Sequence, residues 1–288
     1  MPLAEHFVRA PDWRWYILFY FFLAGLSAGL YVLGSMLRFF GRPADAAAAR
    51  FAFLASFPLL AVCPILLTID LGQPIRFWHM LIDSGQGGLI FKGYSPMSVG
   101  VWALSLYGAC CFFSFMEAWL APGRTGILGR AVNTLGVLLA LYVCTYTGVL
   151  LSVSNQPVWS DAWPLGGLFL ASALSGSAAL LLIGRRLRPE MAPSSERIAN
   201  ADLYFVVLEA ALIVLFLITV AVAGTVLKLV GGASLLLWLV VLVGLAVPIL
   251  GRLRLPGAAA LAHGVAGPVL VLAGVLALRA VVIFGGQS

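Results

Sequence analysis

Long apolar runs alternate with short polar segments along the whole chain, and this pattern predicts helices that cross a membrane. A spanning helix needs about 20 consecutive, mostly apolar residues. Eight runs are close to this length: Trp15–Leu37, Phe51–Ile69, Met97–Met116, Ala131–Val153, Trp163–Ile183, Leu203–Leu227, Ala233–Leu250 and Ala258–Leu278. We therefore predict an all-α polytopic membrane protein, with one membrane domain over residues 1–288 and its eight transmembrane helices in two four-helix bundles. The seventh run is short, and we expect Pro268 to kink the eighth.

Composition supports this interpretation. The chain is 62% hydrophobic and 10% charged, with a mean hydropathy of +1.06, whereas a soluble domain carries roughly 25% charged residues. The formal charge of +6 is not gathered into a basic run long enough to follow a phosphate backbone. Nucleic-acid binding is therefore not expected.

The distribution of basic residues predicts the orientation in the membrane. Cytoplasmic loops carry an excess of Lys and Arg. The loops after the first, third, fifth and seventh runs hold eleven of the 17 basic residues: Arg38, Arg42, Arg50, Arg124, Arg130, Arg185, Arg186, Arg188, Arg197, Arg252 and Arg254. The other six are assigned to the opposite face: Arg9, Arg14, Arg76, Lys92, Lys228 and Arg279. Both termini and the loop 70–96 are thus predicted to lie outside the cytoplasm.

The stretch Asp70-Leu-Gly-Gln-Pro-Ile-Arg-Phe-Trp-His79 opens that loop and is the densest in chemical groups. It holds a carboxylate, an amide, a guanidinium, an indole and an imidazole. Gly72 and Pro74 within it break the preceding helix, so these groups lie on an irregular turn. We interpret it as the mouth of a binding site, although an ion pair from Asp70 to Arg76 that fixes the turn would suit the same residues. At 27 residues the loop is too long for a simple connection. It would form a lid or dock a partner subunit, and we favour docking.

Two tyrosines are expected at similar depths below the same face. Tyr20 lies roughly 8 Å of helix rise below Trp15, and Tyr146 lies roughly 10 Å from the end of the fourth run. A phenol hydroxyl at that depth needs a hydrogen-bond partner. The sequence thus predicts that Tyr20, Tyr146 and the Asp70 turn converge near one face of the membrane.

Ionisable residues inside a bilayer are candidates for function because each costs about 3 kcal/mol or more when unpaired. Glu209 in the sixth run and His263 in the eighth meet this description. Both are predicted in the cytoplasmic half. They would form either a proton entry route or a structural hydrogen-bonded pair, and the sequence leaves both interpretations open.

The sequence offers no pattern for a metal centre. Four cysteines lie inside apolar runs without CxxC spacing, which predicts no zinc and no iron–sulfur cluster within this chain. Haem bound by two imidazoles needs two histidines at matched depth, but of the three histidines only His263 falls inside a predicted helix.

Several motifs resemble those of the NrfD/PsrC family, the integral membrane subunits of polysulfide, nitrite and related respiratory reductases. They are Trp13-x-Trp15, Phe22-Leu-Ala-Gly-Leu-Ser-Ala-Gly29, Asp70-Leu-Gly-x-Pro-x-Arg-Phe-Trp78, Ser95-Pro-Met-Ser-x-Gly-Val-Trp102, Tyr146-Thr-Gly-Val-Leu-Leu151 and the Pro-x-Trp that ends at Trp159. These motifs cover the first half of the chain, and the second half matches in helix count.

The resemblance implies a membrane anchor that holds no redox metal and binds a quinone, menaquinone or ubiquinone, near the non-cytoplasmic face. It implies a ferredoxin-like partner with four iron–sulfur clusters and a molybdopterin catalytic subunit, at the outer side of a bacterial inner membrane. By position, Tyr146 is similar to the family's quinone-pocket tyrosine. Where some relatives carry His and Asn on the first helix, this chain has Tyr20 and Ile17.

The expected quinone-binding residues are therefore Tyr20, Asp70, Arg76, His79 and Tyr146. The expected proton path contains Glu209 and His263, so proton translocation stays open. Two other classes of function are also considered. A secondary transporter would show discontinuous helices near the midplane and an inverted repeat, and no such repeat is visible. A purely structural anchor would tolerate Tyr146→Phe and Asp70→Asn without loss of quinol turnover.

Overall fold

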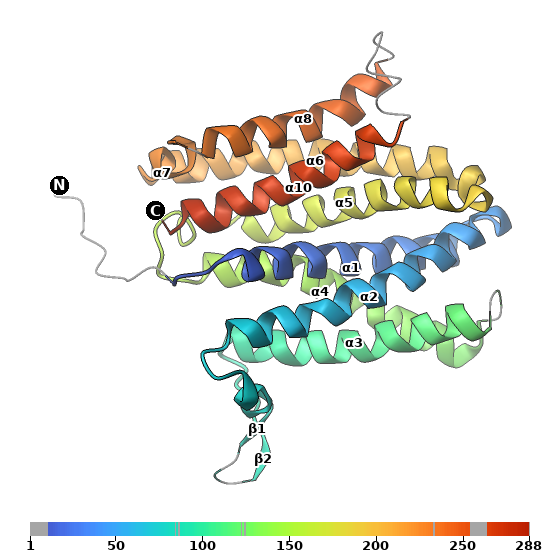
Figure 1. Ribbon diagram of the computed structural model, residues 1–288, viewed down its shortest axis with the longest axis horizontal. Coiled ribbons are helices and arrows are strands. Elements are labelled where there is room, and N and C mark those ends of the chain that lie inside the picture. Colours follow the sequence, from blue (N-terminus) through green and yellow to red (C-terminus); the bar gives the residue numbers. More distant parts are fainter. Residues whose placement is uncertain are drawn as a thin grey trace.

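A computed structural model describes residues 11–83, 85, 87–121, 123, 125–232, 234–253 and 264–287. Within these ranges eight helices are long and apolar enough to cross a membrane. They are α1 (Trp15–Phe40), α2 (Ala46–Asp70), α3 (Pro96–Leu120), α4 (Ile127–Ser152), α5 (Leu165–Leu187), α6 (Ser195–Val222), α8 (Ser234–Arg252) and α10 (Ala266–Gly285). Figure 1 shows them side by side in one elongated bundle. The protein is an all-α polytopic membrane protein, as the sequence predicts.

The spans form two sets of four. Helices α1 to α4 pack on one another, and α5, α6, α8 and α10 form the second set. The sets meet where α5 contacts α1 and α4 and where α10 contacts α1. Each described span is continuous, so the broken midplane helices expected of a transporter are not seen in these eight helices.

The helix ends gather at two opposite ends of the bundle. We call the end that holds Trp15, Asp70 and Gly285 the hairpin end, and the end that holds Arg38 and Arg130 the arginine end. Trp13 and Gln287 meet at the hairpin end, because the backbone N–H of Trp13 donates to Gln287 Oε1 at 2.7 Å and Gln287 Nε2 donates to the Trp13 carbonyl at 3.1 Å. The chain therefore enters and leaves the bundle on one side.

Small residues bring α1 close to the second set. A Cβ at Gly29 would collide with Ser177 and with the carbonyl of Ala173 on α5. A Cβ at Gly25 would lie 2.8 Å from Arg279 Nη2 of α10. Close approach of backbones over glycine is a common way to pack helices in lipid. The glycine motif of the first helix thus serves helix packing.

The loop between α2 and α3 has regular structure that the sequence pattern does not predict. It contains the short 3₁₀ helix η2 (Pro74–Met80) and a hairpin of two strands, β1 (Ile82–Asp83) and β2 (Gly88–Leu89). Figure 1 shows this segment extending beyond the helices at the hairpin end. Trp102 Nε1 of α3 donates to the Ile90 carbonyl at 2.7 Å, which anchors the segment to the bundle.

Shorter elements complete the chain. They are the 3₁₀ helices η1 (Pro43–Asp45) and η3 (Pro189–Ser194) and the short helix α7 (Val226–Val230). The predicted sixth run is divided, because α6 ends at Val222 and Gly224 adopts a positive φ of +79° before α7 begins. Helix α6 also starts at Ser195, two turns before the predicted Leu203.

The last helix corrects two expectations. Pro268 lies in the first turn of α10, where a proline does not remove a helical hydrogen bond, so it is not the site of a kink in the middle of the helix. Helix α10 also continues to Gly285, past the predicted end at Leu278. Arg279 is therefore inside the helix and 1% exposed, and its assignment to the non-cytoplasmic face was wrong.

Candidate functional site

The structure brings two of the predicted site residues together. Tyr20 of α1 and Tyr146 of α4 are both buried, and their side chains interact through the hydroxyl groups. Tyr142, one turn before Tyr146, stacks on it with ring centroids 5.7 Å apart and an angle of 16° between the planes. Two phenols thus share one buried position in the first helix set.

The other two helices of this set close around the tyrosine pair. Cys63 of α2 lies with its Sγ 4.0 Å from the Tyr20 carbonyl. Gly100 of α3 lies against the hydroxyl end of the Tyr146 ring, and a Cβ at that position would overlap the ring. The pair is therefore held by all four helices of the first set, and glycine is the residue that leaves room for Tyr146.

The remaining predicted quinone residues lie nearer the surface of the hairpin end. Asp70 is the last residue of α2, seven residues or roughly 10 Å beyond Cys63. Arg76 is exposed on η2, and the imidazole of His79 stacks on Trp78 with centroids 3.7 Å apart. Among the salt bridges of the described residues there is none between Asp70 and Arg76. The structure separates this group from the buried tyrosine pair by about two helical turns.

Glu209 lies in the second helix set beside a buried arginine. Its side chain on α6 is 2% exposed and interacts with Ser172 of α5 and electrostatically with Arg279 of α10. Arg279 Nη1 donates to Ser172 Oγ at 2.9 Å and to the Val275 carbonyl at 3.2 Å. Its guanidinium lies 5.1 Å from the centre of the Phe169 ring, and Nε has no hydrogen-bond partner in the described structure. Ser172 therefore links the two charges.

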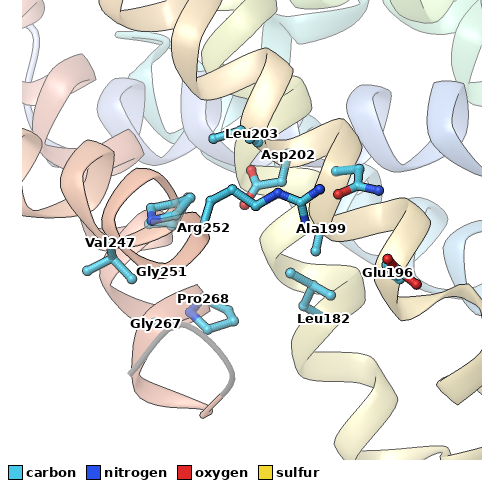
Figure 2. Close-up of a pocket in the computed structure, with 13 residues that line it drawn as sticks. Leu182, Glu196, Ala199, Asp202, Leu203, Val247, Gly251, Arg252, Gly267 and Pro268 are labelled. Carbon is cyan, nitrogen blue, oxygen red and sulfur yellow. The ribbon is translucent and has the colours of Figure 1, made fainter. Parts of the chain in front are cut away.

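A pocket of about 290 Å³ opens at the arginine end of the second set. Figure 2 shows Asp202 of α6 and Arg252 of α8 in its wall, with Pro268 of α10 and Leu182 of α5. Asp202 is buried and accepts a hydrogen bond from Ser175 Oγ at 3.0 Å. Ser175 and Glu209 then line a cavity of about 10 Å³ deeper in the set, which is close to the smallest space that holds one water. Polar groups thus run from the pocket towards the middle of the bundle.

Comparison with known proteins agrees with this architecture. A family model described as polysulphide reductase, NrfD, matches residues 3–288. The chain belongs to the NrfD family. It is 29% identical to a polysulfide reductase chain of Wolinella succinogenes over 96% of this chain and 94% of that protein. It is 28% identical to protein NrfD of Escherichia coli over 99% of this chain and 97% of that protein. A selenate reductase subunit of Mesobacillus selenatarsenatis is 29% identical over 44% of this chain and 27% of that protein.

Family membership makes this chain a membrane subunit of a respiratory oxidoreductase, of a kind that interacts with quinone. In the described part of this NrfD-family protein, no three His, Cys, Asp or Glu side chains are grouped as ligands for a metal ion. The four cysteines are buried in the helices without disulfides. The tyrosine, serine and carboxyl groups described above offer hydrogen bonding and proton transfer.

Sequence reasoning missed part of the second helix set of this NrfD-family protein. Arg279 follows an apolar run, which favours a loop position, and Ser172, Ser175 and Asp202 give no signal of their own. The available signal is that the apolar residues continue beyond Arg279 through Val281, Val282 and Ile283, which places the arginine inside a span. His263 lies outside the described residues, so its predicted place beside Glu209 stays a prediction.

A second polar network occupies the first set near the arginine end. Arg38 Nη1 contacts Glu117 Oε2 at 2.7 Å and donates to Asn133 Oδ1 at 3.2 Å. Asn133 Nδ2 donates to Ser114 Oγ at 2.8 Å and to Tyr31 Oη at 3.2 Å. This network ties α1, α3 and α4 together and neutralises the charge of Arg38 inside the bundle.

Proposed function

We propose that this protein is the quinone-reactive membrane subunit of a multisubunit respiratory oxidoreductase, and that the Tyr20–Tyr146 pair is part of its quinone site. The observation that carries the proposal is the meeting of two buried phenols from α1 and α4 at a level that lipid-soluble molecules reach. Buried hydroxyl groups among apolar walls fit a ligand with two carbonyl oxygens and an apolar ring.

The residues of the pair have separate roles in this proposal. Bound quinone would supply two-electron chemistry coupled to the uptake or release of two protons. Tyr146 would donate a hydrogen bond to one carbonyl oxygen, with its ring position fixed by Gly100 and Tyr142. Tyr20 would place its own phenol against Tyr146 and so orient the hydroxyl of Tyr146.

Asp70, Arg76 and His79 would serve the surface end of the same site. They lie between the buried tyrosines and bulk water, two of them on the exposed turn of η2. Asp70 and His79 would carry protons between the site and water, and Arg76 would attract negative charge towards it. The separation of about two helical turns is short enough for a few intervening waters.

The hairpin segment supports a role in docking. Ile75, Leu89, Phe91 and Tyr94 are between 64% and 88% exposed on the turn and hairpin that extend beyond the helices. Several large apolar side chains exposed on one short segment outside the helices favour a protein interface. We propose that a ferredoxin-like subunit with four iron–sulfur clusters docks there and exchanges electrons with a molybdopterin catalytic subunit. Two of the named relatives belong to polysulfide and selenate reductases.

The asymmetry of basic residues supports the orientation. Nine of the described arginines lie at the arginine end: Arg38, Arg42, Arg50, Arg130, Arg185, Arg186, Arg188, Arg197 and Arg252. Arg14, Arg76, Lys92 and Lys228 lie at the hairpin end. We propose that the arginine end faces the cytoplasm of a bacterium and that the hairpin end and both termini lie on the outer side of the inner membrane.

Proton translocation is a further part of the proposal. Asp202, Ser175 and Glu209 extend inward from the pocket at the arginine end, and Ser172 links Glu209 to Arg279. Glu209 would take a proton from that side and hold it near Arg279. His263 remains a predicted member of this route.

The test is purification of the complex in mild detergent, identification of its subunits and an assay of menaquinol and ubiquinol oxidation. We expect an iron–sulfur subunit to co-purify and Tyr146→Phe to lower quinol turnover at least tenfold, about 1.4 kcal/mol in transition-state free energy. Tyr142→Phe is the matched control, since it removes a phenol hydroxyl one turn away but keeps the ring that stacks on Tyr146. Quinol turnover unchanged in Tyr146→Phe would exclude the tyrosine pair as the site.

A further inference from the structure

A large hollow at the arginine end of the first helix set has no part in the proposed quinone site. Its volume is about 860 Å³, and it lies between the end of α1, η1, the start of α2, the end of α3 and the start of α4. Four arginines line it: Arg38, Arg42, Arg50 and Arg130. Arg38, Arg42 and Arg50 lie within 13 residues around the connection between α1 and α2, and the fold brings Arg130 of α4 to them.

The charges in this hollow are unevenly balanced. Arg38 is already paired with Glu117 at 2.7 Å, and its guanidinium lies 4.1 Å from the centre of the Phe53 ring. Arg42, Arg50 and Arg130 form no salt bridge among the described residues, and Glu190 is the one carboxylate in the wall. Among the described residues of the wall, three guanidinium groups without a salt bridge stand against one carboxylate, which is an excess of two positive charges.

The fold fixes at least one of these cations. Arg50 Nε donates to the carbonyl of Ala118 at the end of α3 with a distance of 3.0 Å. This bond holds the side chain across the gap between α2 and α3 and leaves its two terminal nitrogens for another acceptor. Arg50 lies four residues inside α2, so its guanidinium is held at the level where the helices leave the apolar layer.

The walls of the hollow are apolar on the side of the helices. Leu37, Phe39, Ala46 and Ala118 contribute to the lining. At the same end of the bundle Phe40, Trp119 and Ile127, at the ends of α1 and α3 and the start of α4, are between 62% and 90% exposed, as expected of large apolar side chains at the interface of a bilayer. A free anion would leave these walls in contact with water, whereas the acyl chains of a lipid would cover them.

We propose that this hollow binds the headgroup of an anionic phospholipid with two phosphate groups, with Arg42, Arg50 and Arg130 as its ligands. Two phosphodiesters match the two positive charges, and arginine binds phosphate oxygens through paired N–H groups. Basic pockets between membrane helices on the cytoplasmic side are suited to such headgroups. The inference concerns lipid binding and does not depend on the reaction at the tyrosine pair.

The experiment uses the purified complex, washed extensively in detergent and titrated with defined lipids. Cardiolipin carries two phosphodiesters, phosphatidylglycerol carries one, and phosphatidylethanolamine has no net charge. Pyrophosphate serves as a soluble anion without acyl chains. The readouts are bound lipid by native mass spectrometry and the shift in Tm at each lipid concentration. We expect cardiolipin to bind and raise Tm at concentrations at which the other three have little effect.

The double variant Arg50→Gln/Arg130→Gln tests the site. Each surface arginine is expected to raise the affinity for an anionic headgroup about fivefold. Loss of two arginines should therefore lower the affinity for cardiolipin about 30-fold. The control Arg185→Gln/Arg188→Gln removes the same charge from the same end outside the hollow and should change the affinity less than threefold. Arg42→Gln, at an exposed position, should reduce the affinity about fivefold. This single variant tests the site even if the double variant does not fold.

Three results would overturn the proposal. Equal losses in the two double variants would mean that cardiolipin responds to the general charge of the arginine end. An equal effect of pyrophosphate would identify a site for soluble anions. Binding of cardiolipin that survives both Arg42→Gln and Arg50→Gln/Arg130→Gln would place the lipid elsewhere.

Discussion

Arg279 of α10 donates a hydrogen bond to Ser172 of α5 at 2.9 Å, and through that serine it is joined to Glu209 of α6. Each residue comes from a different helix of the second set, and all three are buried. Two ionisable groups inside an apolar layer would each be costly alone. Their proximity explains how the fold accommodates both.

Glu209→Gln should lower proton-coupled activity of the assembled complex. The substitution keeps the size and hydrogen bonding of the side chain but removes the titrating group at the end of the Asp202–Ser175 series. We expect at least a tenfold loss of proton translocation per quinol oxidised, measured in proteoliposomes, and unchanged artificial-dye activity of the soluble subunits. The control is Glu190→Gln, an exposed carboxylate of η3 at the same end that does not line the pocket beside Asp202. If quinol and dye activities fell equally, Glu209 would be a structural residue.

Arg279→Leu should destabilise the protein because it leaves Glu209 without its nearest positive charge. Removing one partner of a directly paired buried ion pair costs about 3–5 kcal/mol. We expect a smaller loss here, because among the described residues Arg279 and Glu209 are coupled through Ser172 and not by a salt bridge. The double variant Arg279→Leu/Glu209→Leu should recover most of that loss, since neither charge is then buried. Thermal unfolding in detergent, followed by the fluorescence of the tryptophans, measures both effects. A double variant as unstable as Arg279→Leu alone would show that the two charges are not coupled.

Gly100→Val should disable the proposed quinone site without unfolding the protein. A side chain at this position overlaps the hydroxyl end of Tyr146 and would displace the ring from Tyr20. We expect quinol turnover to fall at least tenfold while subunit assembly is retained. Gly108→Val on the same helix is the matched control, because a Cβ there meets a single side-chain carbon of Leu60 at 3.8 Å. Full quinol turnover in Gly100→Val would argue against a role for the position of Tyr146.

Trp159→Phe should lower the free energy of unfolding, because Trp159 packs the segment before α1 against the end of α10. Trp159 is fully buried, stacks on Trp13 with centroids 5.2 Å apart and donates from Nε1 to the Val282 carbonyl at 2.7 Å. Phenylalanine would remove this hydrogen bond, at a cost of about 1 kcal/mol in the free energy of unfolding, while the Val282 carbonyl keeps the bond that it accepts from the Gly286 N–H at 3.2 Å. Trp163→Phe, at a position that is 69% exposed, should stay within about 0.5 kcal/mol. Equal stability of the two variants would contradict the assigned role.

The position of Trp159 illustrates a limit of local sequence patterns. The Pro-x-Trp motif is typical of a polar external turn that ends in an indole, and an indole near a membrane surface is ordinarily an interfacial anchor. In the structure the indole contacts Trp13, which lies 146 positions earlier in the sequence, and Val282, which lies 123 positions later. Such an environment depends on contacts that no local pattern contains.

The sequence by itself determined the class of fold and the depth of the main polar groups. A backbone in lipid must satisfy its hydrogen bonds within the segment, so each long apolar run has one solution, the helix. Position along a helix then converts directly into depth, which is why Tyr20 and Tyr146 could be assigned to similar levels and the Asp70 turn to the surface.

Only the tertiary structure decided which side chains meet. Depth says nothing about the rotation of a helix or the identity of its neighbours, and both depend on packing between residues far apart in the sequence. Packing turned Tyr20 towards Tyr146, placed Arg279 beside Ser172 and Glu209, and gathered Arg42, Arg50 and Arg130 around one hollow. The sequence predicted these residue types at their depths; the rotation and packing of the helices decided which of them act together.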